Sequence, residues 1–181
     1  MVSIWVAAKR AVAPSVDAIR PAASINSIGG AVPPQIAQLA KLESLALGEN
    51  QFEGALPASV LSLTALKTLR LGANPFSGAI PPAIGQLGNI VTLDLSNNQL
   101  RGEAPVALQS LGHLGSGELD LRYNAIAISD PVLRAYLEQK QAGGDILGSQ
   151  TLPPANVSAD VSHDPFASPG AGIVSWDLAA Y

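Results

Sequence analysis

The sequence has no cysteine, few aromatic residues and no long apolar run. Because none of its 181 residues is cysteine, disulfides, thiolate metal sites and cysteine nucleophiles are excluded together. No segment reaches the roughly 18 consecutive apolar residues that a membrane-spanning helix needs. Residues 1–18 lack a positively charged leading segment and carry only a short apolar run, so we expect no recognisable signal peptide.

Charge is also scarce and is not clustered. Charged residues make up 13% of the chain, and the 10 lysines and arginines are scattered, with a formal net charge of −4. Phosphate binding needs a concentrated basic stripe, so nucleic acid is not an expected partner. The chain contains no G-x-S-x-G, phosphate-binding loop, H-E-x-x-H or dinucleotide fingerprint. We therefore predict a protein that is not an enzyme and needs no cofactor.

One pattern recurs at a fixed spacing through more than half of the chain. Asparagine returns at steps of 24 residues and then at one step of 26. After each of the first four asparagines, glycine follows four residues later and proline seven residues later. An alternating pair of leucines, such as Leu69 and Leu71 before Asn74, precedes every asparagine but the first. The recurring asparagines are Asn26, Asn50, Asn74, Asn98 and Asn124.

This spacing predicts stacked coils that share one core. Alternation places Leu69 and Leu71 on one side of a short strand, and Thr68 and Arg70 on the other. A single coil cannot bury its leucines, so we expect successive coils to form one continuous core and their strands to align as a parallel sheet. The recurring asparagines should be buried and should bond to backbone groups that water cannot reach.

The repeats resemble plant-type leucine-rich repeats, whose units read N-x-L-x-G-x-I-P-x-x-I-G-x-L. The matching stretches include NQFEGALPASVLSL at 50–63 and NPFSGAIPPAIGQL at 74–87. This resemblance covers residues 26–124 and implies an α/β solenoid, a short right-handed horseshoe with a parallel sheet on its concave face. It also implies a second short strand on G-x-I-P and a loose helical turn after it. Plant receptors usually flank such repeats with cysteine-paired caps, so the lack of cysteine favours bacterial relatives.

The chain divides into four parts. A helix is predicted over 130–140, with Asp130 as N-cap and Pro131 in the first turn. Its apolar stripe is Val132, Leu133, Tyr136 and Leu137. The predicted parts are a degenerate N-terminal cover at 1–25, repeats at 26–127, a C-terminal capping helix at 128–144, and a linker with an irregular tail at 145–181. Residues 1–25 could instead be the start of a gene model that begins inside a longer repeat array.

The tail resembles the opening of a fibronectin type III module. The stretch N-V-S-A at 156–159 fits a first strand, and V-S-W-D at 174–177 fits a second strand that carries a tryptophan. Bacterial surface proteins join such modules to leucine-rich repeats in this way. Because a module of this kind needs about seven strands, we expect residues 151–181 to be a truncated remnant.

The concave face carries the candidate binding residues. Side chains on a rigid sheet, with strands about 4.8 Å apart, make a good platform for a partner, and tyrosine and arginine often anchor interfaces. Asp94 and Asp120 could also form a carboxylate pair or a calcium site, but Arg70 beside Asp94 and Arg122 near Asp120 favour ion pairs, so no metal is expected. The alternative is that these positions are simply solvated. The candidates are Thr68, Arg70, Thr92, Asp94, Asn97, Asp120, Arg122 and Tyr123.

The sequence thus predicts non-catalytic recognition of a protein or peptide ligand on the concave face. By resemblance, the protein is expected to be extracellular or at the cell surface, and to be a monomer. The alternative function is a structural spacer, or a fragment of a larger bacterial adhesin or of a leucine-rich-repeat hydrolase whose active module is absent.

Overall fold

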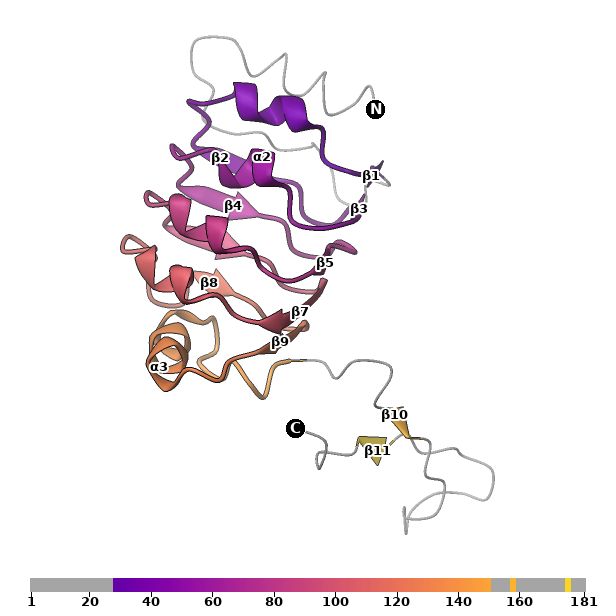
Figure 1. The fold of residues 1–181 in the computed structure, drawn as a ribbon, viewed down its shortest axis with the longest axis vertical. Coiled ribbons are helices and arrows are strands. Elements are labelled where there is room, and N and C mark those ends of the chain that lie inside the picture. The colour runs from indigo at the N-terminus through magenta and orange to yellow at the C-terminus, as the bar shows by residue number, and fades with distance from the viewer. Residues whose placement is uncertain (1–27, 151–156, 159–174, 177–181) are drawn as a thin grey trace. The chain divides into compact units, whose positions relative to one another are not determined.

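The computed structural model describes residues 28–150, 157–158 and 175–176. Residues 28–150 form a stack of coils (Figure 1). The strands of this stack are β1 Gly29–Gly30, β2 Ser44–Ala46, β3 Gln51–Phe52, β4 Thr68–Arg70, β5 Ser77–Gly78, β6 Thr92–Asp94, β7 Gln99–Glu103, β8 Leu119–Asp120 and β9 Ala125–Ala127. Its helical segments are the 3-10 helices η1 Pro34–Gln38, η2 Pro82–Gln86 and η3 Val106–Ser110, and the α-helices α2 Ala58–Leu61 and α3 Pro131–Lys140.

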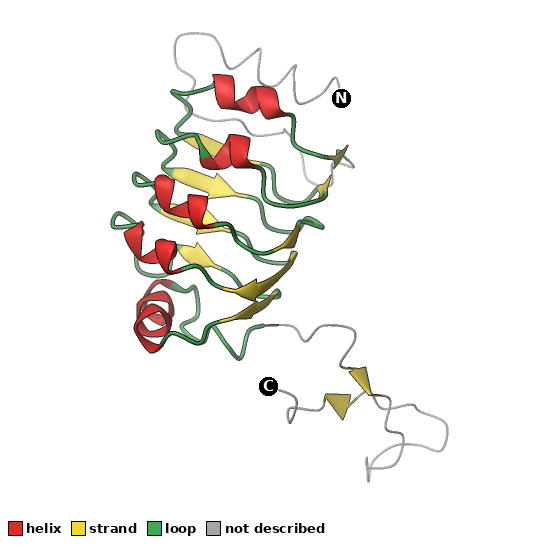
Figure 2. Cartoon of the chain, viewed as in Figure 1, coloured by secondary structure: helices red, strands yellow, loops and turns green. Residues whose placement is uncertain are grey.

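Strands of successive coils pair in parallel. The main sheet has the order β2-β4-β6-β8. Its register places Leu45 beside Leu69 and Leu69 beside Leu93, so equivalent repeat positions meet. In a second set of strands, β1 pairs with β3, and β5, β7 and β9 form another parallel sheet. Figure 2 shows the helical segments stacked along one side of the coils, in front of the main sheet. This arrangement confirms the predicted α/β solenoid with a parallel sheet.

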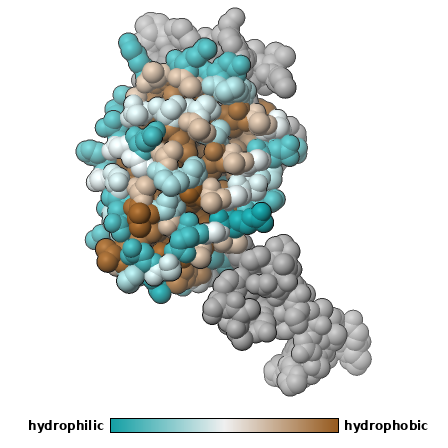
Figure 3. Space-filling view, viewed as in Figure 1, coloured by the Kyte–Doolittle hydropathy of each residue, from teal (hydrophilic) through white to brown (hydrophobic). Residues whose placement is uncertain are grey.

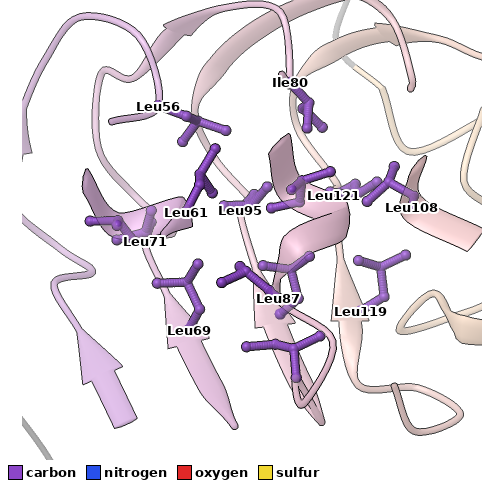
Figure 4. Close-up of a cluster of buried hydrophobic side chains, with 14 of the residues drawn as sticks. Leu56, Leu61, Leu69, Leu71, Ile80, Leu87, Leu95, Leu108, Leu119 and Leu121 are labelled. Atoms are coloured by element: carbon purple, nitrogen blue, oxygen red, sulfur yellow. The ribbon is translucent and has the colours of Figure 1, made fainter. Parts of the chain in front are cut away.

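The repeat leucines fill the space between the main sheet and the helical segments. Leu69 and Leu71 from the β4 coil and Leu61 at the end of α2 are at most 1% exposed, and Figure 4 shows such side chains converging between strand and helix. Phe52 and Phe76 stack across two coils with ring centroids 6.4 Å apart. Burying each leucine is worth about 1.5–3 kcal/mol, but only if a neighbouring coil covers it.

Two of the second strands lie slightly earlier in the repeat than the family pattern implied, whereas β7 runs through its glycine. The resemblance places this strand on G-x-I-P, whereas β3 and β5 end before or at the glycine. Gly54 and Gly78 have φ of 86° and 81°, the left-handed region that favours glycine, so the chain turns there. Pro57 and Pro81 then hold the backbone extended before the helical turn begins.

The helix predicted over 130–140 is α3. Oδ1 of Asp130 accepts the backbone N–H groups of Val132 at 2.8 Å and Leu133 at 3.0 Å, which confirms the predicted N-cap. Leu133 and Leu137 are fully buried, and Tyr136 is partly buried. The predicted apolar stripe is wrong for Val132, which is 68% exposed. It precedes Leu133 by one residue, about 100° around the helix, and so points away from the core.

The segment that follows α3 also packs against the stack. Residues 145–150 were assigned to a linker, yet Ile146 is fully buried. The backbone N–H of Tyr123 donates to the oxygen of Ser149 at 2.7 Å. The cap therefore extends to residue 150 and covers the last edge of the main sheet, where unpaired backbone groups would otherwise be open.

Parts of the prediction lie outside the described residues. These are the N-terminal cover at 1–25, Asn26 and most of the tail. Within the unit Thr151–Tyr181, β10 Val157–Ser158 and β11 Ser175–Trp176 pair antiparallel, at the two places where strands were predicted. A pair of two-residue strands does not identify a fibronectin type III module, so that resemblance stays a prediction.

Candidate binding surface

We call one surface of the stack the sheet face. It consists of the outward residues of the main-sheet strands and of the short stretch that follows each strand, up to the residue before the ladder asparagine. The helical segments η1, α2, η2 and η3 contain no charged residue. Figure 3 faces that helical side and shows hydrophobic and hydrophilic residues alternating across it. On the helical side the charged residues within helical segments are those of α3, whereas the sheet face carries charged residues in each of its four coils. The sheet face comprises Ser44, Ala46, Gly48 and Glu49; Thr68, Arg70, Gly72 and Ala73; Thr92, Asp94, Ser96 and Asn97; and Glu118, Asp120, Arg122 and Tyr123.

Asparagines tie the coils together beneath the sheet face. Nδ2 of Asn98 donates to the backbone oxygens of Leu71 at 3.3 Å and Leu95 at 2.9 Å. Its Oδ1 accepts the backbone N–H of Phe76, in the preceding coil, at 3.2 Å. The equivalent bonds recur at the asparagine one coil earlier and at the one a coil later. Each of these side chains therefore satisfies buried backbone groups in two coils.

Asn50 departs from this pattern. Its Nδ2 donates to Leu47 and Gly48 of its own coil, at 3.1 and 2.8 Å. Its Oδ1 has no hydrogen-bond partner in the described part of the chain, although the residue is only 8% exposed. The first described asparagine of the ladder thus carries an unsatisfied buried oxygen.

A glutamine completes the ladder at its C-terminal end. Nε2 of Gln150 donates to the oxygens of Leu121 at 3.2 Å and Ile146 at 2.9 Å. Its Oε1 accepts the backbone N–H of Ile126 at 3.2 Å. Gln150 therefore makes the bonds that an asparagine makes in the preceding coils. The sequence contained a signal for this residue, because Gln150 follows Asn124 by the same 26 residues that separate Asn124 from Asn98.

One residue in each coil adopts a left-handed backbone conformation on the sheet face. Glu49, Ala73, Asn97 and Tyr123 have φ between 51° and 58°, and each directly precedes a ladder asparagine. Asparagine tolerates this region, whereas a bulky side chain there is strained. Tyr123 nevertheless adopts this left-handed conformation, and 50% of its surface is exposed. Tyr123 thus places a large, half-exposed aromatic side chain at the left-handed position that recurs in each described coil.

Asp120 and Arg122 form the predicted ion pair. Nε and Nη2 of Arg122 donate to the Asp120 carboxylate at 2.9 and 2.6 Å, and Gln141 Nε2 adds a bond at 3.3 Å. Partial burial acts to raise the pKa of Asp120, but the hydrogen bonds from Arg122, its charge and the Gln141 bond outweigh it, so the pKa is lowered. Bonding to Asp120 raises the pKa of Arg122. This pair is internally satisfied and joins the sheet face to the cap.

The predicted ion pair between Arg70 and Asp94 is absent from the described residues, so this prediction is wrong. The two residues lie side by side in the register of β4 and β6. However, Oδ1 of Asp94 accepts the backbone N–H and the hydroxyl of Ser96, at 3.0 and 2.7 Å. The carboxylate lies over Gly72, where an added Cβ would come within 2.7 Å of Oδ1. Asp94 therefore turns toward its own strand, and Arg70 is left exposed.

The remaining candidates have different roles. The Thr92 hydroxyl donates to Glu118 at 2.7 Å, while Thr68 is half-buried beside it in the sheet. Asn97 is exposed, next to the buried ladder position. The described residues hold no group of three or more His, Cys, Asp or Glu side chains arranged for a metal ion. Every helix in the described part is too short or too polar to cross a bilayer.

Comparison with known proteins identifies the repeats. The Leucine Rich Repeat family profile matches residues 65–87 and 89–111. The structure is similar to the BIR2 ectodomain of Arabidopsis thaliana, with a TM-score of 0.57 and 28% identity over 64% of this chain and 61% of that one. It is also similar to the Arabidopsis receptor kinase HAESA, solved with the peptide hormone IDA and the co-receptor SERK1 (TM-score 0.53, 35% identity, 57% and 17% coverage). No curated protein sequence matches the chain.

A further similar structure is that of PEPR1–AtPEP1, with a TM-score of 0.60 and 28% identity over 70% of this chain and 17% of that one. The chain thus carries leucine-rich repeats and has the solenoid fold of plant receptor ectodomains. It spans less than two thirds of the length of each of these three structures. The predicted leaning towards bacterial relatives stays a prediction.

Proposed function

We propose that the protein recognises a protein or peptide ligand through the sheet face, without catalysis, and that it acts outside the cell. The observation that carries this proposal is Tyr123, a half-exposed aromatic residue in a left-handed backbone conformation. A bulky side chain in that region costs about 1–3 kcal/mol relative to an unstrained residue. A position with only a structural role would gain stability from asparagine or glycine there.

The surroundings of Tyr123 suit an interface. Arg122 beside it is held by Asp120, so its orientation is set before any partner arrives. Arg70 and Asp94, on neighbouring strands, are not paired with each other and are free to meet groups of a partner. A rigid surface with an aromatic anchor loses little entropy on binding.

The similar structures agree with a binding role. HAESA is seen with a peptide hormone and a co-receptor, and BIR2 was solved as an ectodomain. These statements concern those proteins, and they support the same class of function and an extracellular setting for this chain.

The proposal can be tested by separating binding from folding at Tyr123. A phage library of random linear peptides is panned against the full chain, and the affinities of the selected peptides are measured by biolayer interferometry. Tyr123→Asn should weaken their binding by about 30-fold, the loss expected for an interface anchor. The same variant should fold with equal or greater stability, because asparagine relieves the left-handed strain.

The matched control is Val106→Ser, which removes an exposed apolar side chain on the helical side. It should leave the affinities unchanged. If Tyr123→Asn binds every selected peptide as well as the parent chain does, the sheet face is not the recognition surface. The spacer alternative then becomes the better account.

A further inference from the structure

We infer that Asp94 is the specificity-determining anchor of the sheet face, and that it selects ligands that present a cationic group, an ammonium or a guanidinium. This inference rests on the proposed function and names the chemistry of its ligand. It starts from the contrast between Asp94 and the other carboxylates of the same surface.

Two of the other acidic groups around the sheet face are ion-paired, whereas the exposed Glu49 and Glu118 have no cationic partner among the described residues. Asp120 is paired with Arg122, and Glu118 accepts the hydroxyl of Thr92. At the edge of the sheet, Glu43 forms an ion pair with Lys67 at 2.8 Å. Asp94 differs from the ion-paired carboxylates because both of its hydrogen bonds come from neutral donors of Ser96, and its Oδ2 accepts no hydrogen bond from a described residue. It differs from Glu49 and Glu118 because it is half-buried and held in place by those bonds, whereas they are exposed.

The Asp94 carboxylate is also held in one orientation. Ser96, which is only 7% exposed, fixes Oδ1 through two bonds from one residue. Gly72 on the neighbouring strand makes room for it, since a Cβ at that position would lie 2.7 Å from Oδ1 and 2.9 Å from Oδ2. A short, preorganised acceptor loses little side-chain entropy when it binds a ligand.

Two cations lie near Asp94, and Arg122 interacts with its charge at a distance, but neither forms an ion pair with it in the described part of the chain. Arg70 is its in-register neighbour on β4, and Arg122 follows its in-register neighbour on β8. Arg122 bonds to Asp120 through two nitrogens, and Arg70 forms no ion pair in the described part of the chain. The charge of Asp94 is therefore available to a ligand.

A partner that covers the sheet face removes the Asp94 carboxylate from water and must supply a group that stabilises its charge. A carboxylate that is buried without a cation costs several kcal/mol, so a neutral or acidic group over Asp94 would be rejected. Arg70 restricts the choice of ligand less than Asp94 does, because a long arginine side chain can carry its charge to the edge of an interface. The fixed, short Asp94 is thus the group that discriminates among ligands.

The test uses the peptide library described above. Peptides selected on the full chain should share a lysine or arginine at one position, and replacing it with norleucine or citrulline should weaken binding about tenfold. Asp94→Asn keeps an oxygen that can accept the Ser96 bonds, so its thermal unfolding should match that of the parent chain. It should also lose about tenfold in affinity, and the two changes together should cost no more than either alone.

The matched control is Glu53→Gln, an exposed carboxylate directly after β3, in the second set of strands and away from the main sheet, which should not affect binding. Selected peptides that depend on Tyr123 but have no shared basic residue, or show no coupling to Asp94, would overturn this inference and leave the proposed function intact. A library that yields no peptide dependent on Tyr123 would overturn the proposed function, and this inference with it.

Discussion

The asparagine ladder offers a matched pair of residues that can separate hydrogen bonding from burial. Asn50 and Asn98 occupy equivalent repeat positions, and each is 8% exposed. Asn98 bonds to the preceding coil, through Phe76 and Leu71, whereas Asn50 bonds only to its own coil. Replacing either residue with alanine removes the same side chain at the same degree of burial. The two substitutions differ in the hydrogen bonds that they remove.

The expected magnitude follows from which backbone groups lose their last partner. In Asn98→Ala, the oxygens of Leu71 and Leu95 each keep a bond from another ladder asparagine. The N–H of Phe76 has no other acceptor among the described residues, so it becomes a buried orphan. Such an orphan costs about 1–3 kcal/mol, and the lost bonds and cavity bring the total to about 2–4 kcal/mol.

In Asn50→Ala no N–H group loses its acceptor. The oxygen of Leu47 keeps its bond from Asn74, and the part-buried oxygen of Gly48 loses its bond from Asn50. The substitution also removes an oxygen that has no partner among the described residues. We therefore expect a loss of about 1 kcal/mol or less. Urea unfolding of the full chain, followed by far-ultraviolet circular dichroism, measures both values. Equal losses for the two variants would refute the claim that bonds between coils, rather than buried asparagine itself, stabilise the stack.

Three further predictions follow from the ladder, the left-handed positions and the ion pair. Gln150→Ala should lower the free energy of unfolding by about 1–3 kcal/mol, because it orphans the N–H of Ile126, and an unchanged urea midpoint would contradict this. Ala73→Gly should raise the free energy of unfolding by about 0.5–1 kcal/mol, since glycine adopts a φ of 55° without strain; a lower thermal midpoint would argue otherwise. The pKa of Asp120 is lowered in the fold, because bonds and charge from Arg122 outweigh partial burial. The stabilising contribution of Asp120 should thus be complete at neutral pH and decrease below about pH 4. When the free energy of unfolding is measured from neutral to acid pH, it should fall less steeply in Asp120→Asn than in the parent chain.

Much of the architecture could be predicted because the residue type that recurs at each repeat position indicates whether that position is buried. Leucines that alternate before each asparagine become the buried side of a strand, and Asp130 caps α3 as expected. The errors occurred where the spacing of residues does not specify their surroundings. Val132 fits the apolar spacing of α3, but it lies about 100° around the helix from the buried Leu133 and is exposed.

For the candidate site, the sequence could name the residues of the sheet face but not their bonds. The pairing of Asp120 with Arg122 followed from two residues of one coil, two positions apart, and it is present. The pairing of Asp94 with Arg70 depends on contacts between neighbouring strands, and the sequence does not specify which of several nearby donors Asp94 bonds to. Asp94 bonds to Ser96 instead, because the N–H and hydroxyl of Ser96 lie two residues further along the same coil and reach one carboxylate oxygen together.

The sequence by itself determined the period of the coils, the leucine core and the side of the sheet that faces outward, because these depend on which residue types recur at which spacing. The tertiary structure alone decided which polar groups meet across coils. It assigned the last rung of the ladder to Gln150, left Oδ1 of Asn50 without a partner among the described residues, and bonded Asp94 to Ser96 instead of Arg70. Those outcomes depend on distances of a few ångströms between separate coils, which no repeat pattern specifies.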